Sequence, residues 1–258
     1  MKIEHLSVSR TQLWQECKVK YKYKYHLGLK SNFPEQPWFE YGKIVHKSAE
    51  LFVESKGQTP IREFTEQILN GKIALEDGAE PKKINLESSY ALRLGTHLRS
   101  IETITKHRLG HDGFIEWDFL FDLSPPNKLI LKGFIDRLIP KKDGSYLVLD
   151  YKTTKKGPFR RTSATIKDDL QLQAYAMVVS ETLNVEPQNI LLALYYLDDS
   201  QLVQVRHDKE TLDKCKIKLA TIHEQIADTD PDRAVPTVGY HCSRCEYRDI
   251  CPWSRKKT

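Results

Sequence analysis

The sequence lacks the features that would place the protein in a membrane or among secreted disulfide scaffolds. No apolar run approaches the roughly 18 residues that a membrane-spanning helix needs, and residues 1–16 lack the apolar core of a signal peptide. The cysteines number five, an odd count that argues against a scaffold of paired disulfides. Internal repeats and low-complexity tracts are also missing. These absences predict a soluble, cytoplasmic protein, in the host cytoplasm if a phage encodes it.

The chain also carries little net charge. Its 40 Lys and Arg residues against 35 Asp and Glu residues leave +5. This balance is compatible with a nucleic-acid partner without demonstrating one. Apolar residues make up 40% of the 258 residues, which is enough for the core of one large domain or two small ones.

Two apolar runs rich in branched residues, Leu129–Ile139 and Tyr146–Leu149, predict a β-hairpin. The loop between them contains Lys142–Gly144, and a three-residue loop with glycine last suits a type I turn followed by a left-handed residue. A loop of this kind pairs Lys141 with Ser145.

Counting back from that loop places Asp136 directly opposite Asp150, and facing residues share one side of a sheet. Lys152 projects from the same side, although a one-residue slip in the loop would break this arrangement. Two partly buried carboxylates repel unless something positive lies between them. The pattern therefore predicts a Mg²⁺ or Mn²⁺ site beside a lysine. The alternative is a hairpin whose polar face happens to carry these three side chains.

A helix is predicted over Phe39–Glu54, where apolar residues recur at helical spacing. Gly42 and His46 are four residues apart and share one side of it. A lone helical histidine is more often a packed residue than a ligand. Gly42 would let another backbone approach that side closely.

The segments that flank the hairpin are less informative. Ile61–Leu69 and Ser88–Arg108 favour helices within a helical insertion over residues 56–111. Ile115–Leu123 alternates like a strand. Glu116 on that strand could reach the acidic pair, but a solvated edge charge is the favoured interpretation.

Two basic stretches are candidate DNA contacts. The segment after Lys152 contains the densest group of basic residues: Lys155, Lys156, Arg160, Arg161 and Lys167. Residues 18–25 carry a lysine at every second position, with tyrosines at 21, 23 and 25 between them, and such a pattern can attract phosphates and stack bases. A packed element with inward tyrosines and solvated lysines is the alternative for residues 18–25.

A further helix follows the basic segment over residues 168–183. Asp168 and Asp169 lie near its start, where the helix dipole favours acids. Gln171 and Tyr175 are four residues apart on one face of it.

The tail of the chain gathers three cysteines, Cys242, Cys245 and Cys251, within ten residues. Two thiolates separated by two residues can hold one metal centre, and a third from the next turn fits. A zinc ion or an iron–sulfur cluster needs one more ligand, and the spacing does not separate the two. The chain offers three candidates for the fourth ligand: Cys17, Cys215 and His241.

Taken in order, these motifs resemble the RecB-like exonuclease branch of the PD-(D/E)XK nuclease superfamily. The resemblance spans nearly the whole chain through Ser7-x-Ser9…Trp14-x-x-Cys17, Gly42-x-x-x-His46, Gly133-Phe-Ile-Asp136, Asp150-Tyr-Lys152, Gln171-x-x-x-Tyr175 and Cys242-x-x-Cys245-x₅-Cys251. Bacterial helicase–nuclease subunits such as AddB and the small nucleases of CRISPR adaptation share this pattern. Ile135 replaces the proline of the superfamily's name, and Asp150 fills its D/E position.

The resemblance implies a restriction-endonuclease-like α/β fold, with a central mixed sheet flanked by helices and a helical insertion. It implies that a [4Fe–4S] cluster, with zinc as the alternative, joins the N- and C-termini through four ligands: Cys17, Cys242, Cys245 and Cys251. It assigns the catalytic metal to His46, Asp136, Asp150 and the Tyr151 carbonyl. Lys152 would position and help deprotonate the attacking water. Gln171 and Tyr175 would orient the lysine or contact DNA.

The resulting expectation is a Mg- or Mn-dependent deoxyribonuclease, an exonuclease acting on single-stranded DNA or DNA ends in repair, recombination, phage replication or CRISPR adaptation. The alternative is a catalytically silent DNA- or protein-binding subunit of a helicase–nuclease complex. One domain is expected over residues 1–258. Its parts are N-terminal helices (1–55), the insertion (56–111), a catalytic core (112–207) and the cysteine tail (208–258).

Overall fold

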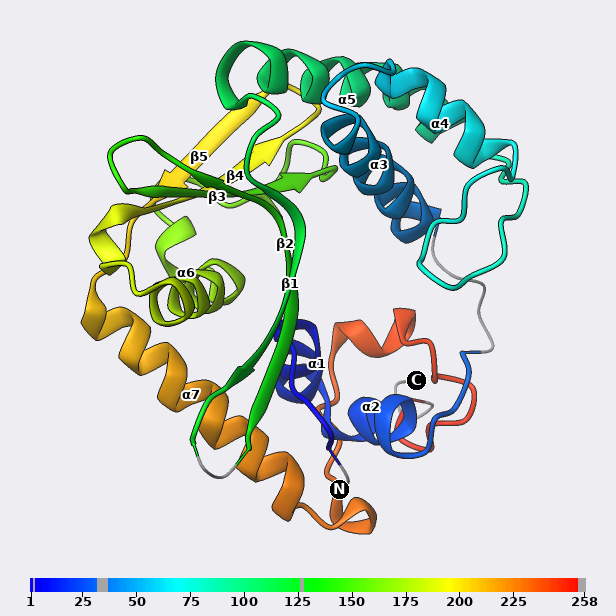
Figure 1. The fold of residues 1–258 in the computed structure, drawn as a ribbon. Helices are drawn as coiled ribbons and strands as arrows, with labels where there is room; N and C mark the ends of the chain where they lie inside the picture. The colour runs from blue at the N-terminus through cyan, green and yellow to red at the C-terminus, as the bar shows by residue number, and fades with distance from the viewer. Residues whose placement is uncertain (2, 32–36, 126–127, 255–258) are drawn as a thin grey trace. The chain divides into compact units, whose positions relative to one another are not determined.

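The computed structural model describes residues 1, 3–31, 37–125 and 128–254. Its centre is a five-stranded sheet whose strands lie side by side in sequence order (Figure 1). The strands are β1 (Phe114–Asp122), β2 (Ile130–Pro140), β3 (Tyr146–Lys152), β4 (Ile190–Tyr196) and β5 (Gln201–Val205). Strands β3 and β4 pair in parallel, whereas β2 with β3 and β4 with β5 pair antiparallel. The predicted α/β fold with a mixed sheet is confirmed.

The described part of the chain contains seven α-helices. They are α1 (Val8–Glu16), α2 (Lys18–Tyr21), α3 (Pro37–Glu54), α4 (Ile61–Leu69), α5 (Ser88–Ile104), α6 (Leu170–Leu183) and α7 (Lys209–Asp228). Helices α2 and α5 each continue into a five-residue π-helical turn. Among the described residues, no helix is both long and apolar enough to cross a membrane.

The β2–β3 hairpin has the predicted register. Lys141 N–H donates to the Ser145 carbonyl at 2.8 Å, and Gly144 has the positive φ, 82°, that the loop requires. Pro140 faces Tyr146, and the pairing continues to Arg137 facing Leu149. Asp136 and Asp150 are the next residues of the two strands, one beyond the last pair of the ladder.

The two faces of the central strands present different side chains. Leu149 and Tyr151 of β3, with Tyr195 of β4, pack into a core with α3, α4 and α5. Because side chains alternate along a strand, Asp150 points to the opposite face. Helix α6 covers that opposite face (Figure 1).

The chain divides into two compact units. Unit 1 comprises Met1–Pro34, Phe119–Gly133 and Asp213–Thr258, and unit 2 comprises Glu35–Asp118 and Phe134–Leu212. All the predicted catalytic and metal-binding side chains belong to unit 2, whereas the four predicted cluster cysteines belong to unit 1. The single domain with four consecutive parts stays a prediction.

Candidate active site and cysteine cavity

The two motif carboxylates lie side by side and are almost fully buried, with Asp136 7% and Asp150 2% exposed. Asp136 Oδ2 accepts a 2.7 Å hydrogen bond from the Tyr151 N–H. Lys152 Nζ lies 2.7 Å from Asp150 Oδ2 as an ion pair. This ammonium is the contact of the buried Asp150 oxygen, which has no further hydrogen-bond partner among the described residues. A buried carboxylate with one such contact keeps acceptor capacity for a metal ion.

Helix α3 brings His46 to the same place. Its Nδ1 lies 3.3 Å from Asp136 Oδ2 and 3.8 Å from Glu116 Oε1, and its Nε2 donates to the Tyr151 carbonyl at 3.1 Å. His46, Glu116 and Asp136 offer ligand atoms within 4.8 Å of one another, and no other such group of three occurs among the described residues. Carboxylate and carbonyl oxygens are ligands that Mg²⁺ and Mn²⁺ prefer, whereas imidazole nitrogen suits transition metals.

Glu116 is the site residue that the sequence interpretation missed. It is half-buried rather than solvated, and its φ of 44° lies in the left-handed region, which is rare for a residue inside a strand. Strained backbone of this kind concentrates at functional sites. The only signal in the sequence was an acidic residue on the strand before the motif hairpin, because a left-handed glutamate cannot be read from strand periodicity.

Burial and neighbouring charges separate the pKa values of the two aspartates. Burial raises the pKa of Asp150 to about 6, with Lys152 opposing the shift and Asp136 adding to it. Burial also acts to raise the pKa of Asp136, but His46 and Lys152 outweigh it and hold that pKa below its usual value. Burial would lower the pKa of His46, yet Asp136 above all raises it well above 6.5. The site thus concentrates negative charge that a cation would neutralise.

Helix α6 places two polar side chains behind the lysine. Lys152 Nζ donates to Gln171 Oε1 at 3.1 Å, and Gln171 Nε2 donates to the Tyr175 hydroxyl at 2.7 Å. Asp169 caps this helix by accepting from the N–H groups of Gln171 and Leu172. Burial, with the charges of Asp150 and Asp136, raises the pKa of Tyr175 well above 10. The tyrosine therefore stays protonated and supports the glutamine that holds the lysine.

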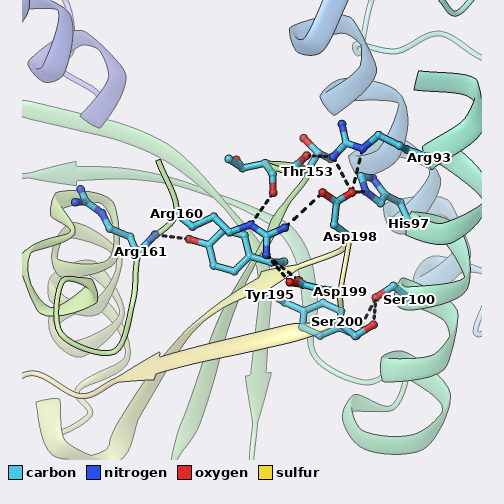
Figure 2. A network of polar contacts seen from close by, with 12 residues as sticks. Arg93, His97, Ser100, Thr153, Arg160, Arg161, Tyr195, Asp198, Asp199 and Ser200 are labelled. Atoms are coloured by element: carbon cyan, nitrogen blue, oxygen red, sulfur yellow. Dashed lines mark hydrogen bonds and ion pairs between the residues drawn. The ribbon is translucent and has the colours of Figure 1, made fainter. Parts of the chain in front are cut away.

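The strand end that carries Lys152 is anchored by a network of arginines and aspartates (Figure 2). Arg93 of α5 donates to the Thr153 carbonyl at 2.7 Å and to Asp198 Oδ1 at 2.8 and 3.0 Å. His97 Nε2 donates to the same Asp198 oxygen at 2.8 Å. Burial lowers the pKa of His97, which leaves its Nδ1 free to accept from the Tyr41 hydroxyl at 2.8 Å.

The predicted DNA-contact residues separate into two kinds. Arg160 is only 8% exposed; it pairs with Asp199 at 2.8 Å and donates to the Thr154 carbonyl at 2.9 Å. Arg161 Nε lies 2.9 Å from Asp169. Arg160 therefore belongs to the anchoring network of Figure 2. Lys155 and Lys156 are exposed.

The alternating lysines and tyrosines of residues 18–25 follow the packed alternative. Tyr21 is 1% exposed. Three of the lysines pair with acidic residues of unit 1: Lys20 with Glu16 at 3.2 Å, Lys22 with Asp232 at 3.0 Å and Lys24 with Glu246 at 3.7 Å.

Unit 1 brings the four predicted cluster ligands to one cavity of about 20 Å³, whose lining includes Cys17, Cys242, Cys245 and Cys251. Cys17 lies in extended backbone between α1 and α2. His241 also lines the cavity, but its Nε2 contacts the Thr237 carbonyl at 2.8 Å. Cys215 is buried on α7 outside the lining, and burial raises its pKa to about 12. The role of the four cysteines as ligands stays a prediction.

Comparisons with known proteins place this geometry among nucleases. The model of the family described as the PD-(D/E)XK nuclease superfamily matches residues 5–252. A solved structure from Eubacterium rectale, provisionally described as an exonuclease, is 13% identical, with a TM-score of 0.55 over 95% of this chain and 88% of that chain. The crystal structure of SSO0001 is 17% identical, with a TM-score of 0.42 over 92% of this chain and 94% of that chain. At these identities a structural likeness shows the fold alone. No curated protein matches the chain.

Proposed function

Since the chain belongs to the PD-(D/E)XK nuclease superfamily, we propose that it is a metal-dependent deoxyribonuclease, acting as an exonuclease on single-stranded DNA or DNA ends. One observation carries the proposal. Asp136 and Asp150 each lie one residue beyond the Arg137–Leu149 pair of the hairpin, with Lys152 2.7 Å from Asp150 and His46 3.3 Å from Asp136. A degenerate binding module would have little reason to keep this costly arrangement of buried charge.

The residues that would hold Mg²⁺ or Mn²⁺ are His46, Asp136, Asp150 and the Tyr151 carbonyl, with Glu116 as a further carboxylate. Support comes from the three ligand atoms within 4.8 Å and from the buried Asp150 oxygen, whose contact among the described residues is Lys152 Nζ. A bound divalent cation supplies polarisation of the scissile phosphate and stabilises the charge on the leaving oxygen.

Lys152 is placed to orient the water or to contact a phosphate oxygen. Burial would lower its pKa, but Asp150 and Asp136 raise it, so the lysine is an ammonium that donates hydrogen bonds. The raised pKa favours a lysine that positions the attacking water over one that removes a proton from it, which was the role expected from the resemblance. Gln171 limits the rotation of the ammonium group through its 3.1 Å contact. Arg93 fixes the strand end one residue further on.

We further propose that Cys17, Cys242, Cys245 and Cys251 hold a [4Fe–4S] cluster in unit 1. All four residues line one cavity in unit 1, and the order of their motifs is the one that the resemblance associates with a [4Fe–4S] cluster. Zinc is the alternative, because the spacing of the cysteines in the sequence does not separate the two.

The test of the nuclease is cleavage of end-labelled single- and double-stranded DNA with Mg²⁺ or Mn²⁺, beside Lys152→Ala. We expect metal-dependent cutting that the variant loses, with a product ladder that gives the polarity. If wild type and variant both bind DNA and neither cuts, the nuclease is refuted. The chain is then a binding subunit that acts with a helicase or another nuclease.

A further inference from the structure

An open groove of about 470 Å³ joins the candidate metal site to the start of helix α3. Its lining includes His46 and Glu116 together with the aromatic side chains of Trp38 and Phe39. Trp38 is 59% and Phe39 56% exposed. Two adjacent large aromatic side chains this exposed, beside a candidate active site, are characteristic of a binding surface rather than of scattered surface residues.

The geometry of α3 gives the distance between these aromatics and the metal site. Trp38, Gly42 and His46 are spaced by four residues and lie along one side of the helix. Eight residues of helix rise about 12 Å. A stacked strand rises 3.4 Å per nucleotide, so Trp38 lies within about four nucleotides of a phosphate held at His46.

Gly42 keeps the groove open between them. Glycine destabilises a helix interior relative to alanine, so its presence needs a reason. Among the described residues, no atom lies within 4 Å of the position that a Cβ on Gly42 would take. The close backbone approach expected there from the sequence is therefore wrong, because this side of the helix faces open space. Neither packing nor a positive φ requires glycine at position 42. The remaining effect of the missing side chain is that it leaves the groove unobstructed between Trp38 and His46.

The charges of the groove suit a phosphate backbone. Lys43 and Lys47 line it, and Lys43 Nζ lies 4.5 Å from the centre of the Phe39 ring. Lys43 pairs with Glu76, whose side chain is 61% exposed. Lys47 lies 3.5 Å from Asp77 but pairs more closely, at 2.8 Å, with Glu50, a groove residue whose side chain is 18% exposed. The exposed Lys43–Glu76 pair contributes little free energy and exchanges readily for other anions, so Lys43 is the groove cation that suits a phosphate.

We propose that Trp38 and Phe39 form a stacking platform for unstacked nucleobases of the strand whose phosphate enters the metal site. Lysines that follow the backbone and aromatic rings that stack bases are the two components of single-strand binding. A base inside a duplex has both faces covered by its neighbours and cannot use the platform. The platform therefore selects a single strand or a frayed end, and this inference rests on the proposed function.

The test measures binding of a fluorescent 12-nucleotide single strand, the same strand with abasic sites, and a blunt duplex. All proteins carry Lys152→Ala so that the strands stay intact. Trp38→Ala is expected to weaken binding of the normal strand by about 5-fold to 150-fold, the range for one lost base stack, and to leave the abasic strand unaffected. Trp38→Phe keeps a stacking ring and should retain most of the affinity. Leu92→Ala, on another exposed apolar residue of unit 2, is the control and should change nothing.

The platform is overturned if Trp38→Ala weakens binding of the normal and abasic strands equally. It is also overturned if Trp38→Ala leaves binding of the normal strand unchanged, which is the result that a protein-docking role for these aromatics would give. A cleavage assay on proteins that keep Lys152 distinguishes failure of the platform from failure of the proposed nuclease. Trp38-dependent binding without cleavage keeps the platform and removes the nuclease. Cleavage by wild type and Trp38→Ala alike, with equal binding, keeps the nuclease and removes the platform. If the protein binds no nucleic acid, both fall.

Discussion

Replacement of Asp150 by asparagine is expected to stabilise the metal-free protein and to weaken its response to divalent cations. Asp150 is 2% exposed, and burial raises its pKa from 3.8 to about 6, against Lys152 and with help from Asp136. At about 1.4 kcal/mol per pKa unit, a shift of about two units means that ionised Asp150 costs the folded state about 3 kcal/mol.

The sign of this effect follows from proton linkage. The folded protein holds the Asp150 proton more tightly than the unfolded chain does. As pH rises from about 4 to about 6, the unfolded chain ionises first, so the stability of wild type falls across this window and stays lowered at pH 7. Asparagine is neutral at every pH and approximates the protonated acid. Its gain should be about 3 kcal/mol at pH 7 and about half of that at pH 5.

The assay is urea unfolding of the full chain in EDTA at pH 5, 6, 7 and 8, repeated with Mn²⁺. Cation at 100 times its dissociation constant should raise the free energy of unfolding of wild type by about 2.7 kcal/mol. Asp150→Asn should gain less, because it has lost a ligand oxygen. The matched control is Asp143→Asn in the exposed turn of the same hairpin, which should gain no stability.

Three results would refute this reasoning. Asp150→Asn could be no more stable than wild type in EDTA, which would mean that the buried charge is compensated by contacts absent from this structure. Its gain could be the same at pH 5 and pH 8, which would exclude titration as the cause. Its response to Mn²⁺ could equal that of wild type, which would remove Asp150 from the metal site.

Three further predictions concern other parts of the molecule. Glu116→Gln should weaken Mn²⁺ binding by about tenfold or more in calorimetry. Asp118 is an exposed acid on the same strand, and Asp118→Asn should leave the affinity unchanged. Equal affinities of the Glu116→Gln variant and wild type would exclude Glu116 as a ligand. Asp198→Ala removes the acceptor of Arg93 and should lower the free energy of unfolding by about 3 kcal/mol in urea, and a loss under about 1 kcal/mol would contradict the anchoring network. Cys17→Ser should lose iron and visible absorbance after anaerobic purification, whereas Cys215→Ser should keep both; colourless wild-type protein with stoichiometric zinc would refute the cluster.

The local parts of the site could be predicted because their geometry depends on neighbouring residues. The three-residue loop ending at Gly144 set the register that places Asp136 and Asp150 one residue beyond the last pair of the ladder. The spacing of four residues put Gln171 beside Tyr175, where a 2.7 Å hydrogen bond joins them. In both cases, backbone geometry over fewer than twenty residues decides which side chains meet.

The parts that could not be predicted depend on contacts across the chain. Arg160 looked like a DNA contact because it lies in a basic, turn-rich segment, yet Asp199 and the Thr154 carbonyl bury it. Glu116 looked like an edge charge because a strand pattern does not reveal that its backbone turns left-handed.

The sequence by itself determined the hairpin that carries the carboxylates and the lysine, since this follows from periodicity and loop length. Through the order of its motifs it also gave the resemblance that implied the mixed α/β fold. Only the tertiary structure decided that Glu116 completes the metal-capable group, that Asp198 anchors the strand end and that Trp38 opens onto the same groove as His46. The physical reason is sequence separation. His46 meets the Tyr151 carbonyl, and Arg93 meets Asp198, across 105 residues of chain, and packing of the whole core selects such contacts.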